Sequence, residues 1–132
     1  ITAEPNQEEF SYLECEWSRN ADAFIIVYSV TSRKTFYEAI MCREKILNRW
    51  HELKQPIVLV GNNIEMNEQR EVAEEEGHQL AQEWGKYCGF LEISSNDRIN
   101  CQECMRPCVR LLRGGYYERG VPNTTSTCCV VL

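Results

Sequence analysis

Three short apolar runs, each continuous rather than alternating, do most to limit what this chain can fold into. They occupy residues 24–30, 57–60 and 90–93, and the first two are rich in β-branched and aromatic side chains. A strand that is covered on both faces has this pattern, whereas a strand with one wet face alternates apolar and polar residues. The runs therefore predict the buried strands of an α/β protein.

Longer amphipathic stretches separate these runs. Residues 35–50, 71–84 and 100–113 place apolar side chains at helical spacing among charged ones. Strands that alternate with helices predict a parallel sheet with helices on both faces, here a sheet of three strands. We assign residues 1–113 to this domain. Residues 114–132 are rich in Gly, Pro, Thr and Ser and are predicted to form a flexible tail.

The loops that follow the predicted strands are the expected place for a ligand. In an open parallel sheet, ligands bind outside the carboxyl ends of the strands. These ends lead into residues 31–33, 61–67 and 94–98. Candidate binding residues are therefore sought in these three loops.

Size and charge exclude some classes of protein. The chain has 132 residues, enough for one domain at most, and its formal net charge is −6. A nucleic-acid binder needs a basic face, so we expect no nucleic-acid partner. The sequence contains no apolar run of about 18 residues, the length that a membrane-spanning helix requires. It begins with Ile1 rather than Met, which predicts a fragment of a longer protein.

The eight cysteines allow a metal-site hypothesis that we do not favour. Cys101, Cys104 and Cys108 have spacings that place them on one face of a helix. A structural zinc site usually takes four ligands from two separate segments. Small hydrophobic side chains on the buried side of a helix explain the pattern better, so no metal site is predicted.

Several segments, in the right order, resemble the Ras family of small GTPases. The similarity runs from about residue 7 to residue 113. It is carried by Gln-Glu-Glu-Phe-Ser at 7–11, by the approach and strand at 19–31, by Val-Gly-Asn-Asn-Ile-Glu at 60–65, by Arg-Glu-Val at 70–72 and by Glu-Ile-Ser-Ser at 92–95. The resemblance implies a truncated P-loop NTPase fold of the Ras-like type, with GTP/GDP and Mg²⁺ as the family's ligands and with protein effectors and regulators as partners. In the family, a further strand lies beside residues 24–30, so this edge is predicted to be bare here.

Other features of the family are missing from this sequence. The phosphate-binding pattern G-x-x-x-x-G-K-[ST] does not occur, and neither does the threonine-bearing switch that helps to bind Mg²⁺. Gln7 matches the glutamine that orients the attacking water and is our candidate catalytic residue. Because phosphoryl transfer depends mainly on positioning and on charge stabilisation, residues 1–132 alone are predicted not to hydrolyse GTP.

The resemblance assigns guanine recognition to residues in two of the three loops. Glu65 stands where the family has the aspartate that accepts hydrogen bonds from the base, and Asn63 stands where the family has a lysine. The full set of candidates is Asn62, Asn63, Glu65, Ser94 and Ser95. The alternative is local turn chemistry, since Asn favours turns and Ser favours helix caps.

The chain ends in Cys129-Val130-Val131-Leu132, a C-a-a-X pattern. A terminal leucine favours transfer of a geranylgeranyl chain to the cysteine. Cys128 is adjacent and could carry a palmitoyl chain, the second signal that stable anchoring usually takes. The alternative is a chance hydrophobic C-terminus. We expect a lipid-anchored protein on the cytoplasmic face of membranes, in particular the plasma membrane.

Two hypotheses for the function follow. The first is a Ras-like, GTP-binding signalling switch at a membrane, of which this chain covers the C-terminal two thirds. The second is a degenerate Ras-like interaction module that binds partners and does not hydrolyse GTP. A phosphate-binding loop upstream of Ile1 would decide for the switch.

Overall fold

The computed structural model describes residues 2–3, 23–49, 56–104, 106 and 128–131. Along the chain these form β1 (Thr2–Ala3), β2 (Ala23–Ser29), α2 (Arg33–Arg49), β3 (Ile57–Asn62), the 3₁₀ segment η1 (Ile64–Gln69), α3 (Glu74–Trp84), β4 (Cys88–Glu92), the 3₁₀ turn η2 (Gln102–Cys104) and β5 (Cys128–Val131).

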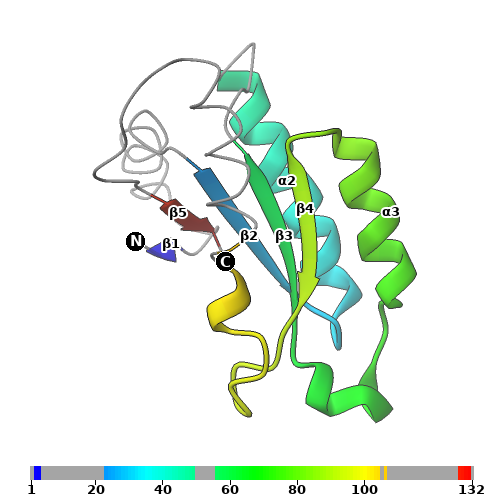
Figure 1. Ribbon diagram of the computed structural model, residues 1–132. Helices are drawn as coiled ribbons and strands as arrows, with labels where there is room; N and C mark the ends of the chain where they lie inside the picture. Colours follow the sequence, from blue (N-terminus) through cyan, green and yellow to red (C-terminus); the bar gives the residue numbers. More distant parts are fainter. Residues whose placement is uncertain (1, 4–22, 50–55, 105, 107–127, 132) are drawn as a thin grey trace.

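One parallel sheet organises the described chain. Its strand order is β1-β5-β2-β3-β4, and every neighbouring pair runs parallel (Figure 1). The pairing of β2 with β3 is the longest, from Phe24 opposite Ile57 to Ser29 opposite Asn62. The carboxyl ends of these strands therefore lie together at one edge of the sheet.

The predicted α/β class and its three strands are confirmed by β2, β3 and β4, but the sheet has five strands rather than three. The edge of β2 was predicted to be bare, and this is wrong, because β5 pairs with it in parallel. Residues Cys128–Val131 were predicted to be part of a flexible tail and instead form this strand. Valine favours extended structure. The rest of the predicted tail, 114–127, lies outside the described residues.

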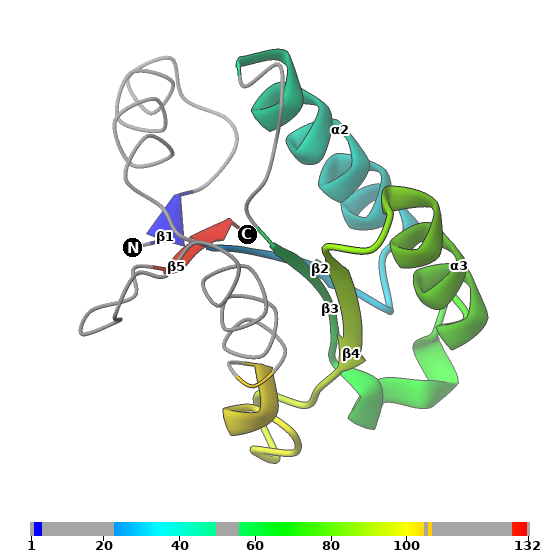
Figure 2. The same cartoon turned by 45° about the horizontal axis from the view of Figure 1, so that its top comes forward.

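Both faces of the central strands are covered, as their continuous apolar runs predict. Phe24, Ile26 and Tyr28 belong to a cluster on the face that α2 and α3 cover, where Phe36 and Leu80 pack among them (Figure 2). The alternate residues belong to a second cluster on the other face, formed by Ala23, Ile25, Val58, Val60 and Ile93. The two helices hence lie on one side of the sheet.

A glycine lets α3 approach the sheet closely. A methyl group on Gly77 would overlap the ring of Phe90 on β4 and would meet the Tyr28 hydroxyl oxygen at 2.8 Å. The helix ends at Gly85, whose φ of 105° is in a region that side chains disfavour. The close approach of Gly77 to Phe90 fixes where α3 crosses β4.

Two helix predictions differ from the structure. The helix predicted for 71–84 begins only at Glu74, after the 3₁₀ segment η1, which the sequence did not indicate. The helix predicted for 100–113 is described only in part, as the turn η2 and Arg106. The remainder of it, including Cys108, lies outside the described residues, as does any arrangement of the three cysteines.

Candidate functional site

Main-chain hydrogen bonds hold the loops after β3 and β4 together. Ile93 N–H donates to the carbonyl of Gly61 at 2.7 Å, and Ile64 N–H donates to the carbonyl of Ile93 at 3.3 Å. The sheet pairing thus continues past the ends of the strands. It brings residues 62–65 beside residues 93–96, which are the segments where the candidate residues were predicted.

Asn62 joins the two loops through its side chain. Its Oδ1 accepts from the N–H of Asn63 at 2.8 Å and from the N–H of Ser95 at 3.1 Å. Its Nδ2 donates to the Ser95 hydroxyl at 3.1 Å. The amide group is therefore used on both ends, and it fixes the main chain of Ser95 relative to the end of β3.

Asn63 faces β2 rather than β4. Its backbone is left-handed, with φ of 68° and ψ of 34°, a conformation that asparagine tolerates better than most residues. Its Nδ2 donates to the hydroxyl of Ser29 at 2.8 Å, and that hydroxyl also lies 2.7 Å from the Thr31 hydroxyl. The ends of β2 and β3 are consequently linked by a polar chain of three side chains.

Glu65 is the acidic group of this site. Its Oε1 accepts from Nδ2 of Asn96 at 3.1 Å. Proximity of the Ser94 hydroxyl, and then of the main-chain N–H of Glu65, lowers the pKa of this carboxyl below its ordinary value.

Ser94 and Ser95 form the opposite wall. Ser94 is fully buried and pairs with Ile99 through reciprocal main-chain hydrogen bonds of 3.0 and 2.9 Å. Its hydroxyl accepts from the N–H of Asp97 at 3.1 Å, which caps the turn. Ser95 is exposed, so its hydroxyl and the Asn62 amide lie at the surface of the site.

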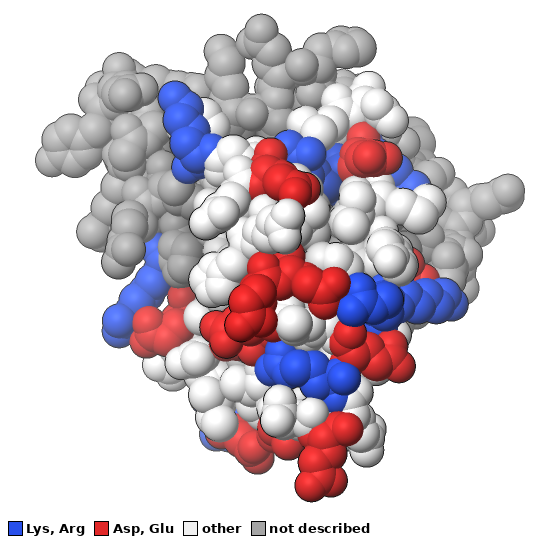
Figure 3. Space-filling view, turned by 90° about the vertical axis from the view of Figure 1, so that its right-hand side faces the viewer, with Lys and Arg blue, Asp and Glu red and all other residues white. Residues whose placement is uncertain are grey.

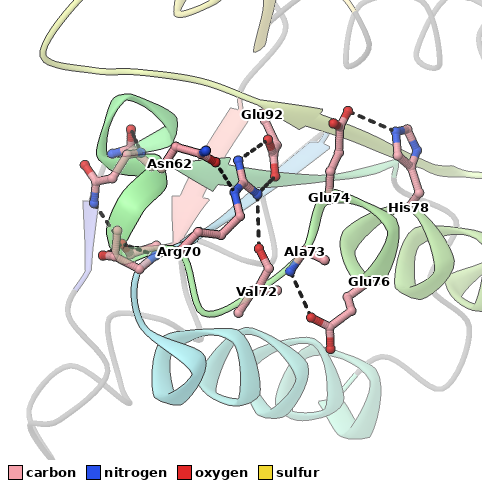
Figure 4. Close-up of polar contacts among 12 residues, drawn as sticks. Asn62, Arg70, Val72, Ala73, Glu74, Glu76, His78 and Glu92 are labelled. Carbon is pink, nitrogen blue, oxygen red and sulfur yellow. Dashed lines mark hydrogen bonds and ion pairs between the residues drawn. The ribbon is translucent and has the colours of Figure 1, made fainter.

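Arg70 braces the end of β4 (Figure 4). Its guanidinium donates to both carboxylate oxygens of Glu92, at 2.7 and 3.0 Å, and to the carbonyl of Val72 at 3.0 Å. The Glu92 side chain is only 10% exposed, so this is a largely desolvated pair with forked geometry. The hydrogen bonds to Glu92 raise the pKa of Arg70. The brace lies two residues before Ser94.

A second arginine ties α2 to α3. Arg33 donates to both carboxylate oxygens of Glu76, at 2.8 and 3.0 Å, and to the carbonyl of Glu71. Glu76 also accepts from the N–H of Ala73, at the start of α3. Figure 3 shows acidic side chains beside basic ones on the face of the molecule that carries α3. These pairs are solvent-exposed and position the helices rather than form a pocket.

A cavity of about 220 Å³ lies between β2 and α2. Asn62 and Asn63 border it at one end, and Thr35, Glu38 and Cys42 line it from the helix. Its remaining wall is the carboxyl half of β2, Ile26–Ser29, of which only Ile26 is in the β2–β5 register. We call residues 62–65 and 93–96, the loops after β3 and β4, the base-side loops. A hollow therefore lies next to them along the edge of β2.

The structure brings Asn62, Glu65, Ser94 and Ser95 together, and Asn63 adjoins them. Gln7 lies outside the described residues. Cys128 and Cys129 are in β5, away from this site. Within the described segments, no cluster of three or more His, Cys, Asp or Glu side chains is placed to hold a metal ion. In the same part of the chain, no helix is long and apolar enough to cross a bilayer.

Two supporting groups were not recognised as such from the sequence. Ser29 is the last residue of β2, and inside the first apolar run nothing local distinguishes it. Arg70 and Glu92 were noted only as parts of matching segments. Nothing local indicates that they form a pair, because 22 residues separate them.

An open parallel α/β sheet with polar side chains gathered at the carboxyl ends of its central strands defines a nucleotide-binding type of fold. A family model described as the Ras family matches residues 2–113. The chain belongs to the Ras family of small GTPases, as the sequence predicts.

Similarity to individual proteins supports this assignment. A Ras-like protein of Laccaria bicolor is 36% identical over 117 residues, covering 89% of this chain and 55% of that protein. The Ras-like protein rasB of Dictyostelium discoideum is 38% identical over 114 residues, covering 86% and 57%. The GTP-binding protein Rit2 of Mus musculus is 37% identical over 107 residues, covering 81% and 48%. The chain thus spans about half the length of these relatives.

Proposed function

We propose that this chain supplies the guanine-recognising part of a Ras-like, GTP-binding switch protein. The observation that carries the proposal is that Asn62, Glu65 and the Ser94–Ser95 turn meet at the carboxyl ends of β3 and β4, where Asn62 and Ser95 are hydrogen-bonded to each other. A guanine ring presents an N–H and an exocyclic amine on one edge, which a carboxylate can accept together. Its carbonyl can take a hydrogen bond from a main-chain N–H in the Ser94–Ser95 turn.

The residues present fit the base of GTP or GDP. Glu65 would accept from the base, Asn62 would hold the loop of Ser95 in place, and the Arg70–Glu92 brace would fix the end of β4. For the phosphates and Mg²⁺, the printed sequence contains no G-x-x-x-x-G-K-[ST] pattern. We therefore expect residues 1–132 to show no Mg²⁺-dependent GTP hydrolysis, and Gln7→Ala to change nothing in a single-turnover assay.

Base recognition is tested by nuclear magnetic resonance on the labelled chain. GDP should shift the amide signals of Asn63, Glu65 and Ser95, and ADP should not. Glu65→Gln removes the charge at constant size and should weaken GDP binding by about tenfold or more, since a lost charged hydrogen bond costs about 1.5–3 kcal/mol. Glu65→Asp should strengthen binding by matching the family's shorter carboxylate. Equal shifts with GDP and ADP would contradict the proposal.

A second candidate is a module that binds protein partners and no longer binds nucleotide tightly. The bond from Asn63 to Ser29 favours it, because in the family this position is a lysine that lies along the base. Restoring that residue is informative. If Asn63→Lys together with Ser29→Ala leaves GDP binding undetectable, the interaction module becomes the better description.

We further propose that the protein is held at the cytoplasmic face of membranes, chiefly the plasma membrane, by a geranylgeranyl chain on Cys129 and a palmitoyl chain on Cys128. Effectors and regulators of the Ras type are its proposed partners. The support is the terminal Cys-Val-Val-Leu pattern. Cys129→Ser should release the protein to the soluble fraction, whereas Cys128→Ser should leave it loosely bound. An unmodified Cys129 in the tail peptide would refute this.

A further inference from the structure

Glu65 is held from the opposite loop by a side-chain amide. Nδ2 of Asn96 donates to Oε1 of Glu65 at 3.1 Å, across 31 residues of sequence. Glu65 lies in the first turn of η1, after β3, and Asn96 lies in the turn that follows β4. The contact therefore joins the base-side loops at the carboxylate that is proposed to accept hydrogen bonds from guanine.

Other donors also surround this carboxylate. The hydroxyl of Ser94, the main-chain N–H of Glu65 and then the Asn96 amide lower the pKa of Glu65 below its ordinary value, so the group is ionised at neutral pH. An ionised carboxylate offers about four acceptor positions, and these three donors leave about one of them free. The guanine edge brings both an N–H and an amine. One of the donors of the protein therefore has to leave before both groups of the base can bind.

Asn96 is the donor that can leave at the lowest cost. Ser94 is fully buried, and its hydroxyl also accepts from the N–H of Asp97, so its oxygen is fixed beside the carboxylate. The N–H of Glu65 belongs to the main chain and moves only with η1. Asn96 is exposed, so water solvates its amide once the bond to Glu65 is broken.

We propose that Asn96 is an internal competitor of the guanine base: its amide occupies an acceptor position of Glu65 that the exocyclic amine of guanine would take, and binding of the base displaces it. This inference rests on the proposed recognition of guanine by Glu65. It goes beyond that proposal by assigning to Asn96 control over how tightly the site binds the base. A carboxamide NH2 and the exocyclic NH2 of guanine are both planar donors, so one replaces the other at the carboxylate.

The bond from Asn96 to Glu65 is tested first and without nucleotide. In a nuclear magnetic resonance pH titration of the full chain 1–132, the side-chain NH2 signals of Asn96 should shift as the Glu65 carboxyl titrates, and Glu65→Gln should abolish this shift. Asn96→Ala should move the pKa of Glu65 towards its ordinary value, because one donor is lost. Asn96 signals that do not follow the titration of Glu65 in the native chain would overturn the bond and the proposal with it.

Competition is tested next by titrating GDP into the native chain and into Asn96→Ala, with ADP as the control ligand. Asn96→Ala should bind GDP about three- to tenfold more tightly, the change that the loss of one exposed hydrogen bond implies. A merely structural role predicts the opposite sign, because a loop that loses a support binds less tightly. Unchanged or weaker binding of GDP by Asn96→Ala would overturn the proposal.

Glu65→Asp supplies the matched background for this substitution. It withdraws the carboxylate by about 1.5 Å, the length of one carbon–carbon bond, so that the Asn96 amide no longer reaches it. Adding Asn96→Ala to Glu65→Asp should therefore change the affinity for GDP by less than about twofold. A gain of equal size in both backgrounds would show that Asn96 does not act through Glu65 and would overturn the competition.

The outcomes keep the two proposals apart. If GDP and ADP shift the same signals in the native chain and in all of these variants, guanine recognition fails and the competition fails with it, whereas the titration without nucleotide still decides whether Asn96 holds Glu65. If Asn96→Ala binds GDP in preference to ADP but no more tightly than the native chain does, guanine recognition stands and the competition is overturned.

Discussion

The loops at the carboxyl ends of β3 and β4 are held in place differently from the outer edge of β2. At the carboxyl ends of β3 and β4, side chains fix the loops through charged and neutral hydrogen bonds, including the Arg70–Glu92 pair and the Asn62–Ser95 bridge. Along the outer edge of β2, a short strand from the far end of the chain pairs with the first half and a cavity follows beside the second half. The first region is held by specific polar contacts, whereas in the second the structure describes main-chain pairing.

The difference indicates which region tolerates change. A polar network that is largely desolvated loses much when one member is removed, because the remaining group stays buried. A short terminal strand loses little when it detaches, since its own ordering entropy is regained. The base-side loops are therefore expected to behave as a rigid unit, and the edge of β2 as the adaptable one. The following predictions test this contrast.

The largest effect is expected for Arg70→Ala. It leaves the 10%-exposed Glu92 carboxylate without its partner and should lower the free energy of unfolding by about 3 kcal/mol. Urea denaturation followed by circular dichroism measures this. Arg70→Lys is the matched control, because it keeps the charge and loses the forked hydrogen bonds to Glu92. Its free energy of unfolding should lie between those of the native chain and of Arg70→Ala. A decrease in the free energy of unfolding smaller than the error of the measurement would show that the Arg70–Glu92 pair does not stabilise the fold.

Asn62→Ala should come next, at about 2 kcal/mol, since it leaves the N–H groups of Asn63 and Ser95 without their acceptor. Asn62→Asp keeps the acceptor oxygen and loses only the donor to the Ser95 hydroxyl, so it should cost less. Hydrogen exchange should report faster opening at Ser95 in the alanine variant alone. Equal exchange at Ser95 in both variants would show that the Asn62 acceptor oxygen does not hold the main chain of Ser95.

Removal of residues 128–132 should have a smaller effect, about 1 kcal/mol, because a four-residue strand offsets most of its burial by its own ordering. Exchange should quicken in β2 and stay unchanged at Ser94 and Arg70. A large destabilisation, or a change at the base-side loops, would mean that the two regions are coupled and would break the comparison.

The smallest effect concerns pH. The Arg33 guanidinium and the Ala73 N–H hold the pKa of Glu76 below its ordinary value. A carboxyl with a lowered folded-state pKa stabilises the fold above its unfolded pKa, and this contribution is lost as the pH falls through the folded pKa. Stability should decline slightly below the ordinary glutamate range, and Glu76→Gln should flatten that part of the profile. Because the pair is exposed, salt should weaken it as well.

The sequence predicts most of the fold's centre and less of its margins. The apolar runs identify β2, β3 and β4 because they are short and continuous, which is typical of a doubly covered strand. It does not reveal that Glu71 binds the main chain of Arg33 instead of beginning α3, nor that a left-handed Asn63 leads into η1. Both depend on contacts between distant segments. The role of β5 is hidden for the same reason, since four apolar residues also match a lipidation signal.

For the candidate site, the residue types were predictable and their connections were not. The family resemblance singled out Asn62, Glu65, Ser94 and Ser95, and the alternation of strands and helices placed them in loops at one edge of the sheet. The bond from Asn63 to Ser29 was not foreseen, because it spans 34 residues and needs the exact register of β2 and β3. The hydrogen bond from Asn96 to Glu65 also appears only once the loops are in place.

The position of β5 also has a consequence for how the chain acquires its structure. Its pairing with β2 joins residues 23–26 to residues 128–131 and so closes a loop that contains every element in between. Closing a long loop is entropically expensive and is rewarded only by the contacts at its ends. Local pairings such as β3 with β4 form early, and distant ones form late. The sheet should therefore fold from β2–β4 outwards, with the C-terminal strand arriving last and leaving first.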